Sequence, residues 1–432
     1  MTNWPVGFLP LYIWPVFVFF LLILYAYTFR NTLKTDSEKL IYWSKSEISN
    51  CIRLLKGEDK MSLIIGADLV PVPANQKLFE ESNLNALFDN EVISILKRAS
   101  YRIFNLETPL TDAERPIAKH GPNLRASVKS IAGIKAIGVD LFTLANNHIM
   151  DQDVQGLEST TETLNKAEIA HVGAGKNLNE AQKPYFFTAE RKQFGVYACT
   201  EHEFSVAAEH KPGANPFDPL ESLDHIQQMK SHCDFAIVLY HGGKEHYRYP
   251  SPYLQKVCRK IVEKGADLVV CQHSHCIGCE EKYQHGTIVY GQGNFLFDVA
   301  DNEFWNTSLL IQIEDDGDIR YIPICKKGCG VRLAPEKEAV EILAAFRQRS
   351  EAIKQPGFLD DQYKAFAETN LDYYVNYFTG NRINLLFRIM NKATGNWLQK
   401  KVSERYRGKL GNAVRNFVEC EAHRELVIKG LS

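Results

Sequence analysis

Short apolar runs that alternate with amphipathic segments are the feature of this sequence that most limits its fold. The apolar runs predict strands at residues 62–65, 102–106, 141–144, 194–198, 235–240, 267–271 and 287–290. The amphipathic segments predict helices at residues 128–137, 156–167, 220–230 and 253–264. Strands that alternate with helices are typical of βαβ units, so we predict a layered α/β fold.

The chain changes character after these units. Residues 308–313 and 319–324 flank a Glu-Asp-Asp-Gly-Asp turn, which predicts a β-hairpin and therefore a sheet of mixed strand direction. From residue 335 to 432 the pattern is helical, with an aromatic-rich stretch at 371–378 and a break at Thr379-Gly380. We expect an α/β domain over residues 61–334 and a helical C-terminal extension over 335–432.

The N-terminal end of the sequence is free of charge. No charged side chain precedes Arg30, although 24% of the chain is charged. Residues 8–27 are almost wholly apolar and long enough to cross a bilayer as a helix. We predict a transmembrane anchor over residues 1–30 and a polar connector over 31–60, hence a single-pass membrane protein with lipid as a partner. A cleaved signal peptide lacks its basic start and small-residue cleavage site here, and a buried soluble helix is the other alternative.

The side of the membrane is left open by the sequence. The basic residues from Arg30 to Lys45 follow the apolar segment, which favours a cytoplasmic body. Of the ten cysteines, those at 199, 233, 258 and 271 lie in or beside apolar patterns, as in a reducing compartment. Two further pairs, at 276/279 and 325/329, do not have the regular spacing of a zinc ribbon. With 50 basic against 52 acidic residues, the charge argues against a nucleic-acid partner.

Polar side chains recur at the ends of the predicted strands. They are Asp68, Asn105, Glu107, Asn146, Asn147, His148, His241, His273, His275 and Asn294. Ligands of α/β sheets bind at the carboxyl ends of the strands, so we expect these side chains to converge on one crevice. Singly, Asp68 and Asn146 also fit turn positions. Jointly, carboxylate, amide and imidazole groups suit one or two divalent transition-metal ions, namely Mn, Fe or Zn.

The ordered motifs carry a resemblance to a known family. They are Gly-Ala-Asp68, Asn105-Leu-Glu107, Asn146-Asn147-His148-x-x-Asp151, His241-Gly-Gly, Gln-His273-Ser-His275 and Gly-Asn294-Phe. Over roughly residues 63–298 the chain resembles the CapA family of capsule and poly-γ-glutamate synthesis proteins. The resemblance implies a calcineurin-like metallophosphatase fold, an N-terminal membrane anchor and work outside the cytoplasm.

The resemblance also implies roles for single residues. Glu107 corresponds to the carboxylate that bridges two metal ions. Asn147, His241 and His273 would complete one ion's site, and Asp68 and His275 would belong to the other. His148 corresponds to a general acid oriented by Asp151, with a metal-bound hydroxide as the nucleophile.

Two positions depart from the family pattern. Val70 stands where metallophosphatases usually carry a histidine ligand, so the sequence does not decide whether the site binds one ion or two. Gln272 stands where the family usually has a glycine. We assign substrate binding to Asn105, Asn146, Asn294, Lys119 and Arg125. For Lys119 and Arg125, a solvated basic loop is the alternative.

These observations lead to three functional hypotheses. The first is a membrane-anchored, metal-dependent hydrolase of surface-polymer biosynthesis that acts on a phosphoester or an acidic polymer, alongside other polymer-synthesis membrane proteins. The second is a non-catalytic assembly or export component whose metal site is structural or vestigial. The third is a binding module that uses its aromatic-rich helical tail against a partner.

Overall fold

A computed structural model describes residues 62–189, 191–297 and 302–431. These residues belong to one compact unit. The predicted anchor at 1–30 and the connector at 31–60 lie outside the described residues. Among the helices that are described, none combines the length and the apolar character needed to cross a bilayer.

The first of two large sheets has eight strands. They are β1 (Ser62–Leu69), β2 (Tyr101–Leu106), β3 (Leu141–Thr143), β4 (Ala170–Val172), β13 (Asn294–Leu296), β14 (Thr307–Glu314), β15 (Ile319–Lys327) and β16 (Gly330–Leu333). Strands β1 to β4 are parallel neighbours, while β14, β15 and β16 extend the sheet on the other side of β1 as antiparallel strands. The predicted hairpin is therefore present and gives this sheet its mixed direction.

The second large sheet has six strands. They are β6 (Tyr185–Ala189), β7 (Lys192–Thr200), β9 (Phe235–His241), β10 (Leu268–Gln272), β11 (Ile277–Tyr283) and β12 (Gly286–Gln292). The four inner strands are parallel, and β6 and β11 are antiparallel edges. A separate pair, β5 (Ala174–Gly175) and β8 (Gly213–Ala214), completes the described strands.

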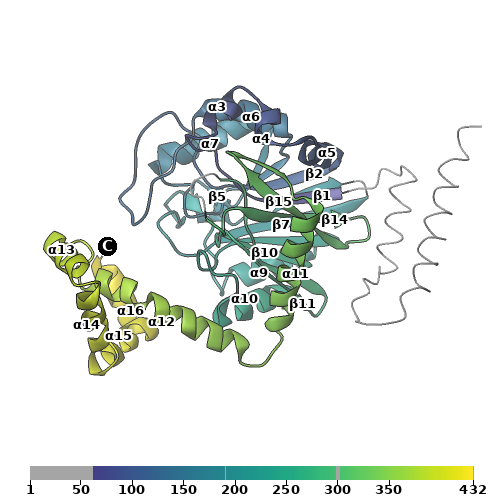
Figure 1. The fold of residues 1–432 in the computed structure, drawn as a ribbon. Coiled ribbons are helices and arrows are strands. Elements are labelled where there is room, and N and C mark those ends of the chain that lie inside the picture. Colours follow the sequence, from purple (N-terminus) through teal and green to yellow (C-terminus); the bar gives the residue numbers. More distant parts are fainter. Residues whose placement is uncertain (1–61, 190, 298–301, 432) are drawn as a thin grey trace, which may run out of the picture. The chain divides into compact units, whose positions relative to one another are not determined.

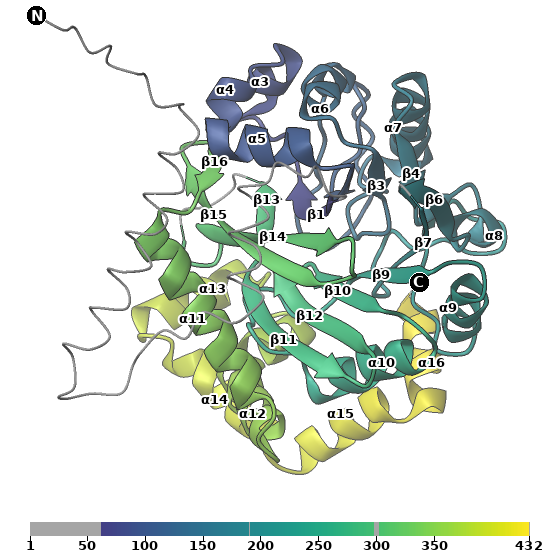
Figure 2. The ribbon, with the colours of Figure 1, turned by 90° about the vertical axis from the view of Figure 1, so that its right-hand side faces the viewer.

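The two sheets face each other and carry helices on their outer sides (Figures 1 and 2). The first sheet is covered by α3 (Gln76–Glu80), α4 (Leu84–Leu87), α5 (Asn90–Arg98), α6 (Ile131–Ile137) and α7 (Asp153–Lys166). The second is covered by α9 (Ser222–Lys230) and α10 (Pro252–Glu263). Because side chains alternate along a strand, Leu63 and Ile65 pack between the sheets and Ile64 packs under the helices. The predicted layered α/β fold is thus confirmed, as four layers.

The helical C-terminal extension is also present. It consists of α11 (Glu336–Ala352), α12 (Phe358–Phe378), α13 (Leu385–Ala393), α14 (Trp397–Arg405), α15 (Lys409–Glu419) and α16 (Glu421–Leu431). Phe346 of α11 packs with Ile277 and Leu309, and Leu359 of α12 joins the core outside the second sheet. The start of the extension is therefore attached to the α/β core by buried apolar contacts.

All seven predicted strands are present, but some ends differ from the prediction. Strand β1 continues to Leu69, so Asp68 lies inside the strand. Asn294 begins β13, which leaves the second sheet and pairs with β1, where Asn294 is opposite Asp68. The register of β1 shifts between Ile65 and Asp68, and a Cβ at Gly66 would come within 1.9 Å of the Phe104 ring. A glycine is therefore required at this bend, which aims Asp68 at the site.

Candidate metal centre

The ends of both large sheets meet at one buried cluster of polar residues. From the first sheet come Asp68, Asn105, Glu107, Asn146, Asn147 and Asn294. From the second sheet come His241, His273 and His275. The strand-end residues singled out in the sequence therefore lie together, with carboxylates and amides on one side and imidazoles on the other.

The first ligand group surrounds His241. Its Nε2 lies 3.3 Å from Glu107 Oε1, 3.0 Å from Asn147 Oδ1 and 3.1 Å from His273 Nδ1. Ligand atoms of Glu107, His241 and His273 all lie within 4.8 Å of one another. Two imidazoles, a carboxylate and an amide oxygen thus converge on a volume suited to one cation.

The second ligand group shares Glu107 and adds Asp68 and His275, again within 4.8 Å of one another. His275 Nδ1 is 3.4 Å from Asp68 Oδ2 and 2.8 Å from Asn294 Oδ1. An Nδ1–H that donates to Asn294 leaves Nε2 as the nitrogen for a ligand. Val70, two residues after Asp68, is buried and apolar, so this strand end offers no further donor.

A frame of amides holds these ligands. The Asn105 Nδ2 donates to Asp68 Oδ1 at 2.7 Å and lies 3.3 Å from His241 Nδ1. The Asn146 Nδ2 in turn donates to Asn105 Oδ1 at 3.0 Å, and the backbone N–H of His148 donates to Asn146 Oδ1. Asn105 and Asn146 are fully buried and bonded within the protein. Their placement fits a positioning role better than the substrate contact expected from the sequence. Asn294 contacts His275 through its Oδ1, but among the described residues its Nδ2 has no hydrogen-bond partner.

Burial and neighbouring charges shift the pKa values of several groups in the cluster. Burial and the negative charge of Asp68 raise the pKa of Glu107 to about 8. Burial lowers the pKa of His241 to about 3, and burial with the neighbouring His241 and His275 lowers the pKa of His273 well below its usual value. Burial opposes the protonation of His275, but the charge of Glu107 and the nearby Asp68 raise its pKa to about 9. Neutral His241 and His273 therefore present lone pairs, which metal ligation requires.

Orphaned oxygens show that a cation fits here. Among the described residues, both carboxylate oxygens of Glu107 and Oδ2 of Asp68 are buried without a hydrogen-bond partner. Buried polar atoms are nearly always hydrogen-bonded, so such atoms indicate a missing partner. The mixed oxygen and nitrogen donors match Zn, Mn or Fe, as expected from the sequence. The ligand groups found among the described residues contain no cysteine.

His148 stands beside the cluster in a charged triad. Its Nδ1 is 2.5 Å from Asp151 Oδ2, and the Lys119 ammonium is 2.5 Å from Asp151 Oδ1. The Lys119 and Asp151 side chains are 2% and 0% exposed. Lys119 is thus bonded to Asp151 instead of lying in a solvated loop, and it fits the orientation of the His148–Asp151 pair better than direct substrate binding.

Arg125 lies apart from the ligand groups. Its guanidinium donates to the Asp112 carbonyl at 3.1 Å and pairs with Glu114 at 3.7 Å. It lines a cavity of about 360 Å³ that also includes Val70 and Thr108, the neighbours in sequence of the ligand strands. A cation on the wall of this cavity is consistent with the predicted contact with an anionic substrate.

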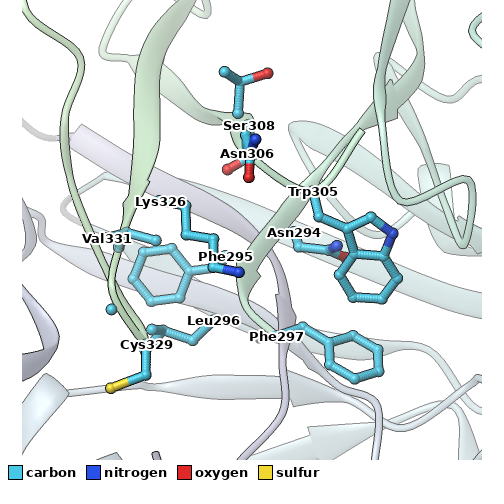
Figure 3. A pocket seen from close by; sticks show the side chains of 12 residues that line it. Asn294, Phe295, Leu296, Phe297, Trp305, Asn306, Ser308, Lys326, Cys329 and Val331 are labelled. Carbon is cyan, nitrogen blue, oxygen red and sulfur yellow. The ribbon is translucent and has the colours of Figure 1, made fainter. Parts of the chain in front are cut away.

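Three neighbours of the histidines escaped the sequence analysis. Glu203 Oε1 lies 4.0 Å from His273 Nε2, Glu245 shares a ligand group with His273 and His275, and the Trp305 indole stacks on His275 at 4.8 Å. Trp305 and Asn294 lie at one end of a small pocket of about 20 Å³ (Figure 3). Glu245 could have been found from the sequence, because it lies only four residues after His241 in the same loop. No nearby motif points to Trp305.

Helix α12 contacts loops on two sides of the cluster. His120, next to Lys119, lies 3.3 Å from the Tyr373 hydroxyl and packs edge-on against Tyr377. Tyr247, in the loop after β9, packs against Phe366 with ring centroids 4.4 Å apart. The C-terminal extension therefore forms part of the rim of the site.

Two solved structures resemble this chain distantly. A phosphatase from Mycoplasma pneumoniae is 17% identical, with 62% of this chain and 94% of that chain covered and a TM-score of 0.38. A 5'-nucleotidase from Staphylococcus aureus, described as putative, is 14% identical, with 67% and 58% covered and a TM-score of 0.38. At such TM-scores the likeness supports no inference about activity.

Sequence comparison is more informative. The PGA biosynthesis protein CapA of Bacillus subtilis is 28% identical over 253 residues, which cover 56% of this chain and 64% of the relative. The capsule biosynthesis protein CapA of Bacillus anthracis is 28% identical over 212 residues, covering 47% and 52%. The chain thus matches less than two thirds of the length of either relative. The family model for the bacterial capsule synthesis protein PGA_cap matches residues 63–299, more than half of the chain, and the chain therefore belongs to this family.

Proposed function

We propose that this protein is a metal-dependent hydrolase of capsule or poly-γ-glutamate synthesis, of the calcineurin-like metallophosphatase type. Its substrate would be a phosphoester or an acidic polymer. The N-terminal apolar segment would anchor it to a membrane, where other polymer-synthesis proteins would be its partners. The family membership supports the process, and the geometry of the cluster supports the chemistry.

The observation that carries the proposal is the Glu107 carboxylate. Both of its oxygens are buried without a hydrogen bond, and they face His241 in one ligand group and Asp68 with His275 in the other. A purely structural glutamate would be paired or exposed, because an isolated buried carboxylate is strongly destabilising. A carboxylate shared by two sets of donors is the arrangement that binds and bridges cations.

Each residue of the cluster has a role in this proposal. Glu107, Asn147, His241 and His273 would hold one ion, and Asp68 and His275 belong to the second group. A bound divalent cation would lower the pKa of a coordinated water toward neutrality and offset negative charge on the substrate.

The proton transfer belongs to His148. The contact of its Nδ1 with Asp151 leaves Nε2 as the nitrogen that carries a proton to a leaving group. Lys119 fixes the Asp151 carboxylate, so the imidazole is held in one orientation. Arg125, on the wall of the neighbouring cavity, is placed to attract an anionic substrate.

Metal content and turnover test the proposal together. We expect the purified full-length protein to contain Mn, Fe or Zn and to hydrolyse two phosphodiesters that differ only in their leaving group. His148→Ala should lower kcat by about 10²–10⁴-fold for the poor leaving group and less for p-nitrophenolate, which needs no protonation. His210→Ala, an exposed histidine outside the cluster, is the matched control.

The opposite outcomes are equally clear. A protein without metal, or activity that survives the loss of His273, would contradict the hydrolase. Bound metal without turnover on any phosphodiester or acidic polymer would favour the non-catalytic assembly or export component instead.

A further inference from the structure

The second ligand group is incomplete when counted from the residues present. Asp68, Glu107 and His275 offer three donors, and Glu107 also belongs to the first group. Asp68 Oδ1 already accepts a hydrogen bond from Asn105, so only Oδ2 is left for a cation. The buried Val70 excludes a further ligand from β1. A second ion therefore needs a donor from another element of the fold.

We propose that Glu245 is that donor and that it binds the second cation together with His275, beside His273 of the first ligand group. Ligand atoms of these three residues lie within 4.8 Å of one another. Glu245 is the exposed member of the group, and both histidines are buried. The inference rests on the metal-binding part of the proposed function and adds to it a ligand on the solvent side.

The backbone holds Glu245 against the histidines. The N–H of His246 donates to the Ser274 carbonyl at 2.8 Å, which joins the loop after β9 to the loop after β10. His246, His273 and His275 have φ values of 59°, 76° and 53°. Such values are unfavourable for residues other than glycine and persist at functional sites, where the surrounding structure imposes them. The conformation of both loops thus serves to bring Glu245, His273 and His275 together.

The ring of His275 is also held in one orientation by its neighbours. Its Nδ1 is engaged by Asn294 on the buried side, and Trp305 stacks on its face with an angle of 25° between the rings. A hydrogen bond from Trp305 Nε1 to His246 Nε2, at 2.9 Å, ties this stack to the Glu245 loop. His275 therefore presents its Nε2 in a fixed direction, as metal-ligating histidines do when their other nitrogen is hydrogen-bonded.

The carboxylate of Glu245 has no competing partner. Among the described residues, no hydrogen bond or ion pair engages it. Carboxylate and imidazole donors together select a divalent transition-metal ion such as Mn²⁺ or Zn²⁺.

Glu203 supplies the matched control. Its carboxylate is 4.0 Å from His273 Nε2, so it places the same charge near the same ring. It does not belong to any of the ligand groups found among the described residues. Glu203→Gln therefore removes a neighbouring charge without changing a ligand, whereas Glu245→Gln replaces a charged carboxylate ligand by a weaker, neutral amide.

The test is a metal titration of the full-length protein after chelator treatment, with Mn²⁺ as the probe. Calorimetry and the Mn²⁺ electron-spin signal should report two ions per chain for the unmodified protein and for Glu203→Gln. Glu245→Gln should lose the second ion, or bind it at least about tenfold more weakly, while the first ion is retained. Circular dichroism and thermal unfolding should be unchanged, because Glu245 is exposed and glutamine has its shape.

Two ions with unchanged affinities in Glu245→Gln, or a single ion in the unmodified protein, would overturn the inference. Phosphodiester turnover, measured on the same samples, separates this failure from that of the proposed function. Turnover with an unchanged Glu245→Gln titration refutes only the role of Glu245. Loss of the second ion in Glu245→Gln without turnover in the unmodified protein supports the ligand and refutes the hydrolase.

Discussion

The two large sheets contribute different chemistry to the same site. Oxygen donors come from the first sheet, where Asp68, Glu107 and Asn147 lie, and nitrogen donors come from the second, where His241 and His273 lie. Neither sheet alone holds the mixed donors of the first ligand group, which a transition metal prefers. The site is therefore a property of the packed pair of sheets, and a bound cation would join them.

The largest expected effect comes from removing one donor on either side. Glu107→Gln and His273→Ala should each lower metal affinity by more than about 100-fold, because even the loss of an outer-shell partner costs about 10- to 100-fold. Turnover should fall with the bound metal. Titration of the chelator-treated protein measures the affinity, with Glu158→Gln and His210→Ala as surface controls. If one of the two variants keeps its metal affinity, the sheet that carries the substituted residue does not contribute a donor that metal binding requires.

A second effect concerns the buried Lys119–Asp151 ion pair, whose two residues lie in the loops that follow β2 and β3 of the first sheet. Lys119→Met should leave the Asp151 carboxylate buried without its partner and destabilise the protein by about 3–5 kcal/mol. Adding Asp151→Asn should restore part of this loss. Denaturant unfolding measures both variants. Lys77→Met, from an exposed pair with Glu81, should change the free energy of unfolding by about 1 kcal/mol or less.

The Lys119 experiment also has a clear opposite outcome. A Lys119→Met protein as stable as the surface control would show that the ammonium is not needed to hold Asp151. A loss of metal in that variant would contradict the view that this pair lies outside the ligand groups.

A third expected effect is a pH-dependent stability of the metal-free protein, caused by the raised pKa values of Glu107 and His275. The pKa of Glu107 is raised from its ordinary 4.5 to about 8, and that of His275 from 6.5 to about 9. A raised pKa stabilises the fold at low pH, and this stability is lost as the pH rises through the folded-state value. Above about pH 7, where His241 and His273 are neutral in both the folded and the unfolded state, the metal-free protein should therefore melt at progressively lower temperature up to pH 9, as measured by calorimetry.

Glu107→Gln is the comparison for this pH dependence. Its melting temperature should fall less steeply over the same range, because one of the two titrating groups is gone. Metal binding at pH 7 should release protons, seen as a dependence of the binding heat on the buffer. A binding heat that is the same in every buffer would contradict these protonation states.

The smallest expected effect concerns the support of a nitrogen donor. Trp305→Ala removes the ring that stacks on His275 and should weaken metal binding by about tenfold, as loss of an outer-shell contact does. Trp305→Phe keeps an aromatic face and should change the affinity by about threefold or less. Metal titration measures both. Equal losses in the two variants would show that the hydrogen bond to His246, and not the stack, supports the ring.

Much of the fold and of the donor set was predictable from the sequence, because both depend on local pattern. The seven apolar runs form strands, and the helices between them follow the amphipathic segments. The polar residues at strand ends lie together because parallel strands bring their carboxyl ends to one edge. Local patterns alone were enough to identify Asp68, Glu107, His241 and His273 as neighbours in space.

What the sequence did not reveal depends on long-range packing. Nothing in the pattern separates strands of one sheet from strands of two that face each other. The move of Asn294 from the end of β12 to a new strand beside β1 has no local signal, and neither does the pairing of Lys119 with Asp151. The apolar segment before Arg30 lies outside the described residues, so its predicted membrane role stays a prediction.

The strand β13 has a consequence for the order of events during synthesis. Its first residue, Asn294, supports the ring of His275 and lies opposite Asp68, near the start of the described chain. The second ligand group is therefore complete only when segments more than two hundred residues apart have met. Contacts of this separation form late in folding, after the local helices and strand pairs. A growing chain shorter than this point cannot assemble the whole site, so a captured cation would mark a chain whose core has closed.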